Sequence, residues 1–281
     1  MNKNHLPFVL LLFLAASCTE RIDVKLDETY TRLVVDGSIT TDSTCSTVTL
    51  TKSSDYFYNK PSPRVTGATV TIFDGTTSYP LIETVAGQSG VYSSGDPLPG
   101  KAGKEYTLHV ELPAAISGYA AFEAGSMLNP IVPIDSVTTT FHADQGKAGA
   151  WAINVYAQEP GNELNYYMFN WFRNGVSMSD SIHLKTVMGD QFINGQYMTG
   201  IPVFYIDNTH GWETLKPGDT ITLQMSGITE NYLNFISQVQ MAGFNLPFFT
   251  GPPANIQGNI GNGGLGYFTA FSNSYATTIV K

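Results

Sequence analysis

Short segments of alternating or β-branched residues, each followed by a turn signal, are the feature that most constrains the fold of this chain. In the first half they recur about every 8–12 residues, which predicts an N-terminal immunoglobulin-like β-sandwich over residues 32–128. The dipeptide Asp74-Gly75 is typical of a hairpin turn, because glycine tolerates positive φ. The predicted strands are Leu33–Ile39, Thr47–Thr51, Ala68–Phe73, Tyr79–Val85, Gly90–Tyr92, Tyr106–Leu112 and Gly118–Glu123.

Residues 129–133 are expected to form a domain boundary, since two prolines there favour extended backbone and interrupt strand pairing. Residues 134–281 predict a second β-rich domain, sandwich-like or barrel-like, so the chain is expected to be mainly β. One helix is predicted near residues 230–242, where apolar side chains recur on one face with a helical period. The predicted strands are Val137–His142, Trp151–Gln158, Tyr166–Arg173, Val203–Asp207, Thr220–Met225, Leu265–Phe271 and Ala276–Val280.

Residues 1–17 are predicted to be a secretory signal peptide, because a basic start is followed by an apolar run too short to span a bilayer. The run ends in Leu14-Ala15-Ala16-Ser17-Cys18, which resembles a bacterial lipobox. That resemblance implies cleavage before Cys18 and acylation of its thiol, with palmitate among the acyl groups. Residues 18–31 would then be a lipid-anchored tether. The alternative is an ordinary secretory signal, with Cys18 in or near the cleaved piece.

The sequence therefore predicts a protein of the cell envelope, attached to the outer membrane through Cys18. Thr19 follows Cys18, where some bacteria use aspartate to retain lipoproteins at the inner membrane, so the outer membrane is the default. Which face of that membrane the protein occupies stays open. The formal net charge of −9 argues against nucleic acid as a partner, because phosphates are bound through lysine and arginine.

Two groups of motifs resemble a known bacterial family. The first is the succession Leu33-Val34-Val35-Asp36-Gly37, Ser53-Ser54-Asp55-Tyr56 and Val65-Thr66-Gly67-Ala68-Thr69-Val70, and the second is Pro253-Ala254-Asn255-Ile256-Gln257-Gly258 with Gly264-Leu265-Gly266-Tyr267-Phe268. Both resemble the lipoproteins of Bacteroidota grouped as domain of unknown function 4249, over nearly the whole mature chain. The resemblance implies a shared fold and compartment, and it carries no established activity. Members often occur beside TonB-dependent outer-membrane transporters, which implies an association with one.

Two glycine-rich segments match nucleotide-binding loops only by letter. In Gly95–Ala102, two prolines remove backbone N–H donors, and Ala102 stands where a Mg²⁺-binding hydroxyl is required. The segment Gly261–Gly266 is followed by a predicted strand, whereas a dinucleotide loop opens a helix. We expect neither segment to bind a nucleotide.

Residues for catalysis or metal binding form no recognisable constellation, so no enzyme, cofactor or metal site is expected. His109 is expected to face solvent on its strand, and a polar loop explains His210 and its acidic neighbours more simply than a metal site does. Cys45 has no basic neighbour, which favours a buried or inert thiol. A helical zinc pair requires two histidines three to five residues apart, and no two histidines of the mature chain have this spacing. These histidines are His109, His142, His183 and His210.

Aromatic residues supply the candidate contact surface. The segment Phe244–Pro253 carries Phe244, Phe248 and Phe249 among helix breakers. If exposed, these side chains form a site for a partner or ligand. If buried, they close one end of the second domain, which is the commoner fate of aromatic residues. The run Tyr166–Phe172 poses a similar choice, and a strand buried on both faces is simpler than a glycan platform.

Asp-Ser and Asp-Thr pairs followed by an apolar or small residue resemble the acceptor of periplasmic O-glycosylation in Bacteroidota. The candidate acceptors are Ser43, Ser136, Ser181 and Thr220. Modification of at least one of them is a hypothesis.

The functional hypothesis that the sequence favours is a non-catalytic lipoprotein that binds a partner, a TonB-dependent transporter or its cargo. A stand-alone surface module that binds glycans or peptides is the alternative. An enzyme with an unrecognised site ranks third.

Overall fold

The first strand shows how the alternating sequence folds. In β1 (Leu33–Thr40) every second residue is buried, namely Leu33, Val35, Gly37 and Ile39, whereas the residues between them are exposed or half-buried. The computed structural model describes residues 31–54, 61–209, 214–243 and 256–281. Over these residues the fold is mainly β, and one α-helix, α2 (Glu230–Gly243), lies where the sequence predicts it.

The first half contains strands at every position that the sequence predicts. Asp74 forms the predicted hairpin turn, because its Oδ1 accepts the N–H groups of Thr76 at 3.0 Å and Thr77 at 2.8 Å. The strands hydrogen-bond in the order β1-β2-β5-β4-β3-β6-β7, a continuous path because β5 pairs with both β2 and β4. After β1 they are β2 (Thr47–Lys52), β3 (Thr69–Phe73), β4 (Ser78–Glu83), β5 (Val91–Ser93), β6 (Glu105–Ile116) and β7 (Tyr119–Met127).

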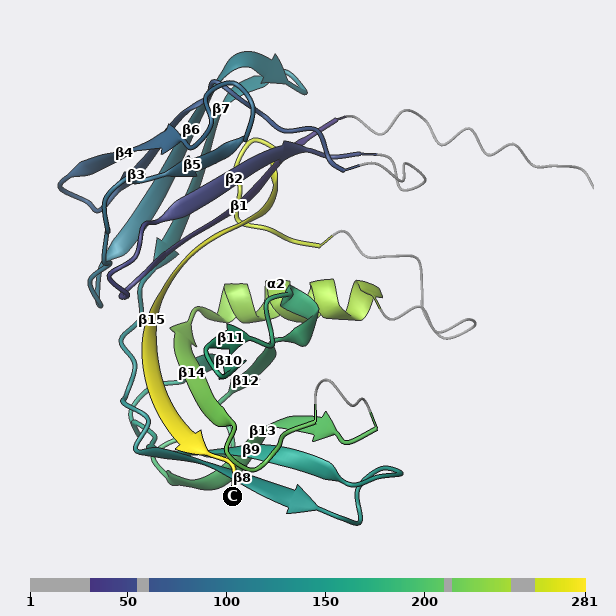
Figure 1. The fold of residues 1–281 in the computed structure, drawn as a ribbon. Helices are drawn as coiled ribbons and strands as arrows, with labels where there is room; N and C mark the ends of the chain where they lie inside the picture. Colours follow the sequence, from purple (N-terminus) through teal and green to yellow (C-terminus); the bar gives the residue numbers. More distant parts are fainter. Residues whose placement is uncertain (1–30, 55–60, 210–213, 244–255) are drawn as a thin grey trace, which may run out of the picture. The chain divides into compact units, whose positions relative to one another are not determined.

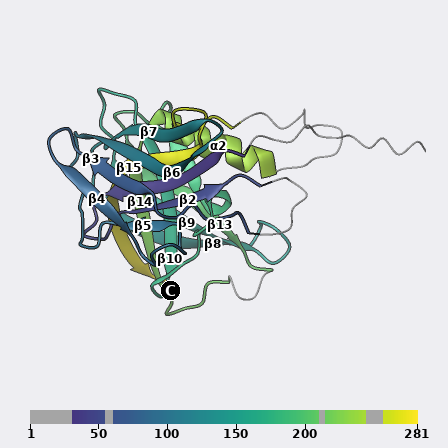
Figure 2. The same ribbon diagram turned by 90° about the horizontal axis from the view of Figure 1, so that it is seen from above.

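The second half contains the remaining strands in two sheets. A three-stranded sheet has the order β13-β9-β8, and β10, β11, β12 and β14 join the larger sheet. Seen from above in Figure 2, β3, β4, β6 and β7 lie nearest the viewer and the three-stranded sheet lies behind them. These elements are β8 (Ser136–His142), β9 (Ala150–Gln158), β10 (Tyr166–Arg173), β11 (Val176–Ser177), the 3₁₀-helix η1 (Ile182–Leu184), β12 (Thr186–Gly189), β13 (Tyr197–Asp207), β14 (Thr220–Ile228) and β15 (Leu265–Ile279).

The last strand, β15, joins the two halves of the larger sheet. Its first part pairs in parallel with β1, from Leu265 to Phe271, and its second part pairs antiparallel with β14, from Ser272 to Ile279. Figure 1 shows β15 in yellow, running from the strands of the first half to those of the second. The sequence predicted two closing strands here, and this prediction was wrong because one strand of 15 residues continues through both.

The connection between the halves is held against β15 and β14 by hydrogen bonds. Ser272 Oγ donates to the carbonyl oxygen of Asn129 at 2.6 Å, and Asn129 Nδ2 donates to that of Ile228 at 3.2 Å. The segment between β7 and β8 contains no strand, as its prolines predict. Residues Thr31–Lys281 form one compact unit, so the division into domains 32–128 and 134–281 stays a prediction.

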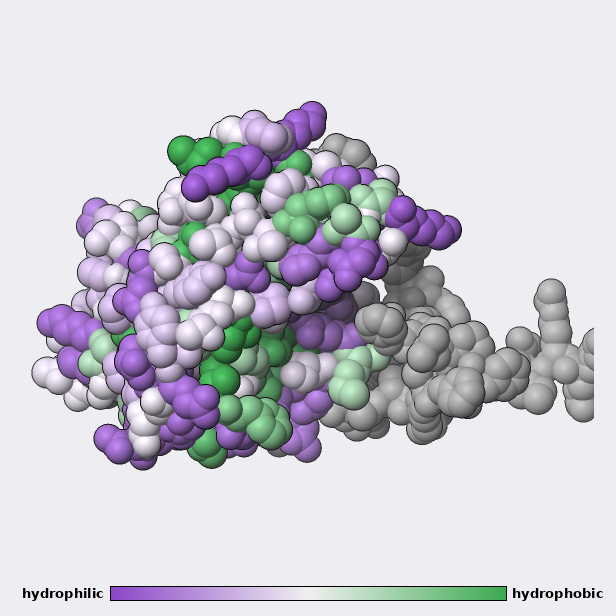
Figure 3. All heavy atoms as spheres, turned by 90° about the horizontal axis from the view of Figure 1, so that it is seen from below, coloured by the Kyte–Doolittle hydropathy of each residue, from purple (hydrophilic) through white to green (hydrophobic). Residues whose placement is uncertain are grey.

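The surface of the described chain is mixed in character. On the face shown in Figure 3, hydrophobic side chains form small groups among hydrophilic ones. Within the described ranges, no helix has the length and apolar character needed to cross a membrane.

The parallel pairing of β1 with β15 depends on Gly266. This residue has φ +87°, and a Cβ added to it would collide with the backbone carbonyl of Val35. We therefore expect Gly266→Ala to lower the free energy of unfolding by about 2–4 kcal/mol, from backbone strain and lost pairing. Gly263→Ala is the matched control, because Gly263 has φ +72° but open space around it, and about 1 kcal/mol is expected. Urea unfolding measures both, and equal losses would contradict this account of Gly266.

Candidate functional site

The edge of the larger sheet is interrupted beside the middle of β10. One side of β10 pairs with β14 along all eight residues. The other side pairs with β12 from Tyr166 to Phe169 and with β11 at Phe172 and Arg173. Between these two pairings, residues 178–185 leave the sheet and form a loop that contains η1. We call this segment the 178–185 loop.

A buried polar network holds the 178–185 loop to the sheet. Asn170 lies at its centre, where its Oδ1 accepts from Lys185 Nζ at 2.9 Å and from Ser179 Oγ at 3.3 Å. Its Nδ2 donates to Gln224 Oε1 at 3.0 Å, and Ser179 Oγ accepts the N–H of Trp171 at 3.0 Å. Asn170, Ser179 and Gln224 are all buried. Because these polar groups bond to one another, the interruption of the sheet is stabilised rather than left as unpaired donors and acceptors.

The charge of Lys185 lies between two carboxylates in this region. Burial lowers the pKa of Lys185, and the negative charges of Asp180 and Asp36 oppose that change. Asp36 keeps exposed surface, yet the protein around its carboxyl removes enough water to raise its pKa, against the attraction of Lys185. Burial also raises the pKa of Tyr232 on α2, and the charge of Asp36 adds to that rise. The charge of Asp36 therefore acts on both Lys185, in the 178–185 loop, and Tyr232, on α2.

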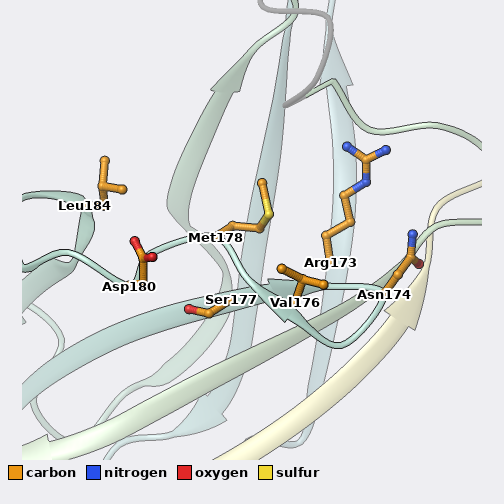
Figure 4. Close-up of a pocket in the computed structure, with 7 residues that line it drawn as sticks. All are labelled: Arg173, Asn174, Val176, Ser177, Met178, Asp180 and Leu184. Atoms are coloured by element: carbon orange, nitrogen blue, oxygen red, sulfur yellow. The ribbon is translucent and has the colours of Figure 1, made fainter.

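The 178–185 loop also forms one side of a surface pocket of about 530 Å³. In Figure 4, Arg173 and Asn174 lie on one side, Asp180 and Leu184 lie on the other, and β11 passes between them. The apolar wall is open to solvent, because Val176 is 64% exposed and Leu184 is 53% exposed. The pocket is lined by Arg173, Asn174, Val176, Ser177, Met178, Asp180 and Leu184.

The rim of this pocket is fixed by an ion pair and a hairpin turn. Arg173 Nε lies 3.0 Å from Asp219 Oδ2, and Asn174 Nδ2 donates to Asp219 Oδ1 at 2.9 Å. Asn174 and Gly175 both have positive φ, as a two-residue hairpin turn requires. The pocket therefore offers an ordered apolar wall at the last strand of the sheet path, a geometry suited to binding an extended segment of another molecule.

A second, smaller pocket of about 300 Å³ lies beside α2 and has a polar lining. Asn231 and Asn234, on the same face of α2, are exposed and present amide groups to it. The ring of Tyr267 packs 4.9 Å from that of Tyr232 and 5.0 Å from that of Phe235. Amide groups beside an aromatic ring can bind hydroxylated ligands such as sugars. The remaining lining residues are Gln238, Gln257, Gly258 and Asn259.

Among the described residues, none that the sequence singled out for modification lines either pocket. Cys18, Phe244, Phe248 and Phe249 lie outside the residues that the structure describes, as does the signal segment 1–17. Of the candidate glycosylation acceptors, Thr220 is half-buried at the start of β14. The other candidate acceptors, Ser43, Ser136 and Ser181, are exposed. Modification of any of the four residues stays a prediction.

The histidines and the cysteine are dispersed over the described residues. His109 is half-exposed and lies 3.3 Å from Glu123, which confirms that it faces outward. His142 is on β8 and His183 is in η1, whereas His210 lies outside the described residues. No group of three or more histidine, cysteine or acidic side chains in the described part of the chain could hold a metal ion. Cys45 is exposed, so its thiol is not buried, and the other alternative, an inert thiol, stays a prediction.

Sequence reasoning missed the polar network and the pocket. The run Tyr166–Phe172 is a strand whose central residues are buried, as predicted, but Asn170 within it is the centre of the network. A polar residue inside an apolar strand was the available signal. The dipeptide Asn174-Gly175 is an equally strong hairpin signal, and it would have located β11.

Comparison with known proteins gives one match to a family. The family model, described as domain of unknown function (DUF4249), matches residues 19–276. A search of curated proteins gives no match.

The partial burial of the Asp36 carboxyl predicts a pH-dependent effect. An acid whose pKa is raised by folding stabilises the fold below its ordinary value of 3.8, and that contribution is lost as pH rises through the raised pKa. At neutral pH the ionised Asp36 therefore opposes folding. We expect Asp36→Asn to raise Tm near neutral pH, by an amount that shrinks towards zero below about pH 4.

The matched control for this prediction is Asp96→Asn, in an exposed surface turn. Its effect on Tm should not follow the same pH profile. A Tm of Asp36→Asn equal to or below that of the unaltered protein at neutral pH would show that attraction to Lys185 outweighs the loss of hydration.

Proposed function

The chain belongs to the family of the domain of unknown function DUF4249, and from this premise we propose that it is a non-catalytic, lipid-anchored outer-membrane protein that binds a partner protein. The partner is a TonB-dependent transporter or the cargo of one. The single observation that carries the binding proposal is the pocket beside β11, with its exposed Val176 and Leu184.

The chemistry of the pocket favours an extended segment of a protein as its occupant. β11 is the last strand of the sheet path, and a terminal strand can accept main-chain hydrogen bonds from an added segment. Val176 and Leu184 provide apolar contact, and the charge of Arg173 is balanced by Asp219. Asp180 adds a negative charge at the opposite side, in a chain with a formal net charge of −9. The favoured segment is therefore apolar with basic residues.

The anchor and the fold class complete the proposal. Acylation of Cys18 would hold the protein at the membrane, since each buried CH₂ of an acyl chain contributes about 0.8 kcal/mol. In an immunoglobulin-like sandwich formed by the first half, the anchored segment would directly precede the first strand, β1. The loop that contains η1 lies far from this segment in the sequence. The lipobox Leu14–Cys18 supports the anchor, and the seven strands of the first half support the sandwich.

A stand-alone glycan-binding module is the second candidate function. The amide-lined pocket beside α2 favours it, because Asn231 and Asn234 are exposed there and Tyr267 supplies an aromatic edge. Two results together would favour this candidate over an accessory role. Purified surface glycans would bind the unaltered protein but not Asn234→Ala, and no partner protein would be recovered with the chain from its membrane.

The first test is a pull-down of the tagged protein from its native membrane in mild detergent. We expect a transporter of the TonB-dependent class, or its cargo, to be recovered in stoichiometric amount. Val176→Asp with Leu184→Asp should reduce that recovery at least tenfold, because two charges would enter the apolar wall. The matched control is Ile82→Asp with Val85→Asp, two similarly exposed apolar residues outside the pocket. Recovery of the unaltered protein alone would overturn the accessory proposal.

A separate test addresses the anchor. Cys18→Ser removes the thiol that would be acylated, so we expect the protein to move from the membrane fraction to the soluble fraction after cell breakage. Cys45→Ser is the matched control and should leave the protein with the membranes, because Cys45 is an exposed residue of the folded part. Detergent partitioning and the intact mass of the purified protein measure the result. A mature chain with the mass of its unmodified polypeptide would contradict acylation.

A further inference from the structure

Two buried carboxylates meet at the end of β10 that lies farthest from the pocket. Glu159 follows β9 and is 1% exposed, and Asp190 follows β12 and is 0% exposed. Three of their four carboxylate oxygens, Glu159 Oε1 and both oxygens of Asp190, are buried without a hydrogen-bond partner. Unpartnered anionic oxygens at this burial are costly, because the charged form loses its hydration with nothing in exchange.

The fourth carboxylate oxygen does have a partner. Tyr167 donates its O–H to Glu159 Oε2 at 2.5 Å. The charged side chains that act on Tyr167 are Glu159, Asp190 and Glu163, all acidic, and with burial they raise its pKa. Burial also raises the pKa of Glu159, and Asp190 adds to that rise through its charge and a hydrogen bond, whereas hydrogen bonds with Tyr167 and Asn165 oppose it. The local field is therefore negative, and either a bound cation or a proton shared by the two carboxyls would neutralise it.

The backbone around the two acids holds them in this arrangement. Two loops, residues 159–165 and 190–196, pack closely enough that a Cβ on Gly161 would lie 3.1 Å from the Cα of Gly195. The N–H of Asp190 donates to the carbonyl of Asn165 at 3.1 Å, and the N–H of Glu159 donates to that of Gln196 at 3.0 Å. Each acid is thus tied through its own backbone to the loop of the other. The two carboxylates are positioned by the fold and are not free surface groups.

We propose that Glu159 and Asp190 bind a divalent cation of the calcium type, which fastens the 159–165 and 190–196 loops together. The three unpartnered oxygens are hard ligands from two carboxylates, and calcium completes its six to eight oxygen ligands with carbonyl, amide and water oxygens. Such a site contains only two acidic residues. A search for groups of three or more ligating side chains therefore does not find it. The proposal also departs from the sequence-based expectation that the chain has no metal site.

Calcium binding to the folded state should raise Tm. Sites of moderate charge bind calcium with Kd of about 0.1–1 mM, so about 10 mM CaCl₂ should raise the Tm of the purified protein by roughly 3–10 °C relative to EDTA. NaCl at equal ionic strength should not reproduce the rise. Asp190→Asn should abolish it, and the amide can donate to Glu159 Oε1, so this variant is expected to fold. Asp144→Asn, at an exposed turn, is the matched control and should keep the full rise.

Terbium luminescence tests the site without a variant of either acid. Tyr167 touches Glu159, so ultraviolet excitation of tyrosine should sensitise bound Tb³⁺, and CaCl₂ should displace the signal. Tyr167→Phe should reduce the sensitised emission at least twofold while Tb³⁺ still competes with calcium in the Tm assay.

Three results would overturn the proposal. The first is an equal Tm in CaCl₂ and EDTA. The second is a calcium effect of the same size in Asp190→Asn. The third is a Tm that rises on acidification but ignores calcium, because it would show that a shared proton, not a metal ion, neutralises the pair.

Discussion

The pairing of β15 with both β1 and β14 is the constraint on which the rest of the described structure depends. β1 belongs to the first core and β14 to the second, so a single strand crosses from one hydrophobic cluster to the other. Phe268 and Ala270 are buried in the first cluster, and Val280, directly after the strand, is buried in the second. Parallel pairing with β1 requires the close backbone approach that Gly266 permits. The two halves are therefore coupled by main-chain hydrogen bonds and not only by side-chain contact.

The strands of this fold were predictable from the sequence because their signals are local. In β1 and β6 the alternation of buried and exposed residues can be counted directly, and the Asp74-Gly75 turn fixes one hairpin. The continuity of β15 was not predictable in this way. The sequence predicted separate strands on either side of Ser272–Tyr275, and this polar link is part of the strand because β14 pairs with it from far away in the sequence. Local propensity contains no information about such a distant partner.

The candidate site escaped prediction for a related physical reason. Asn170 and Lys185 are separated by 15 residues, and Asn170 and Gln224 by 54, so their meeting depends on which strands become neighbours. A polar residue in a buried strand indicates that a partner exists, because leaving it unpaired costs about 1–3 kcal/mol. It does not indicate which residue the partner is. The same holds for Glu159 and Asp190, whose burial becomes visible only when the loops after β9 and β12 are brought together.

Three features of this protein lie along one strand, β10, and the distance between the first and the last argues that the acidic pair and the pocket act separately. Tyr167 contacts the acidic pair near one end, Asn170 centres the polar network, and Arg173 forms the rim of the pocket at the other end. From Tyr167 to Arg173 is six residues, or about 20 Å at the rise of an extended strand. Side chains that far apart, with no shared partner, contribute to stability additively. β10 is also paired with β14 along its whole length, which leaves it little freedom to shift as a unit. A cation at the acidic pair would therefore strengthen the fold around β10 without altering what the pocket binds.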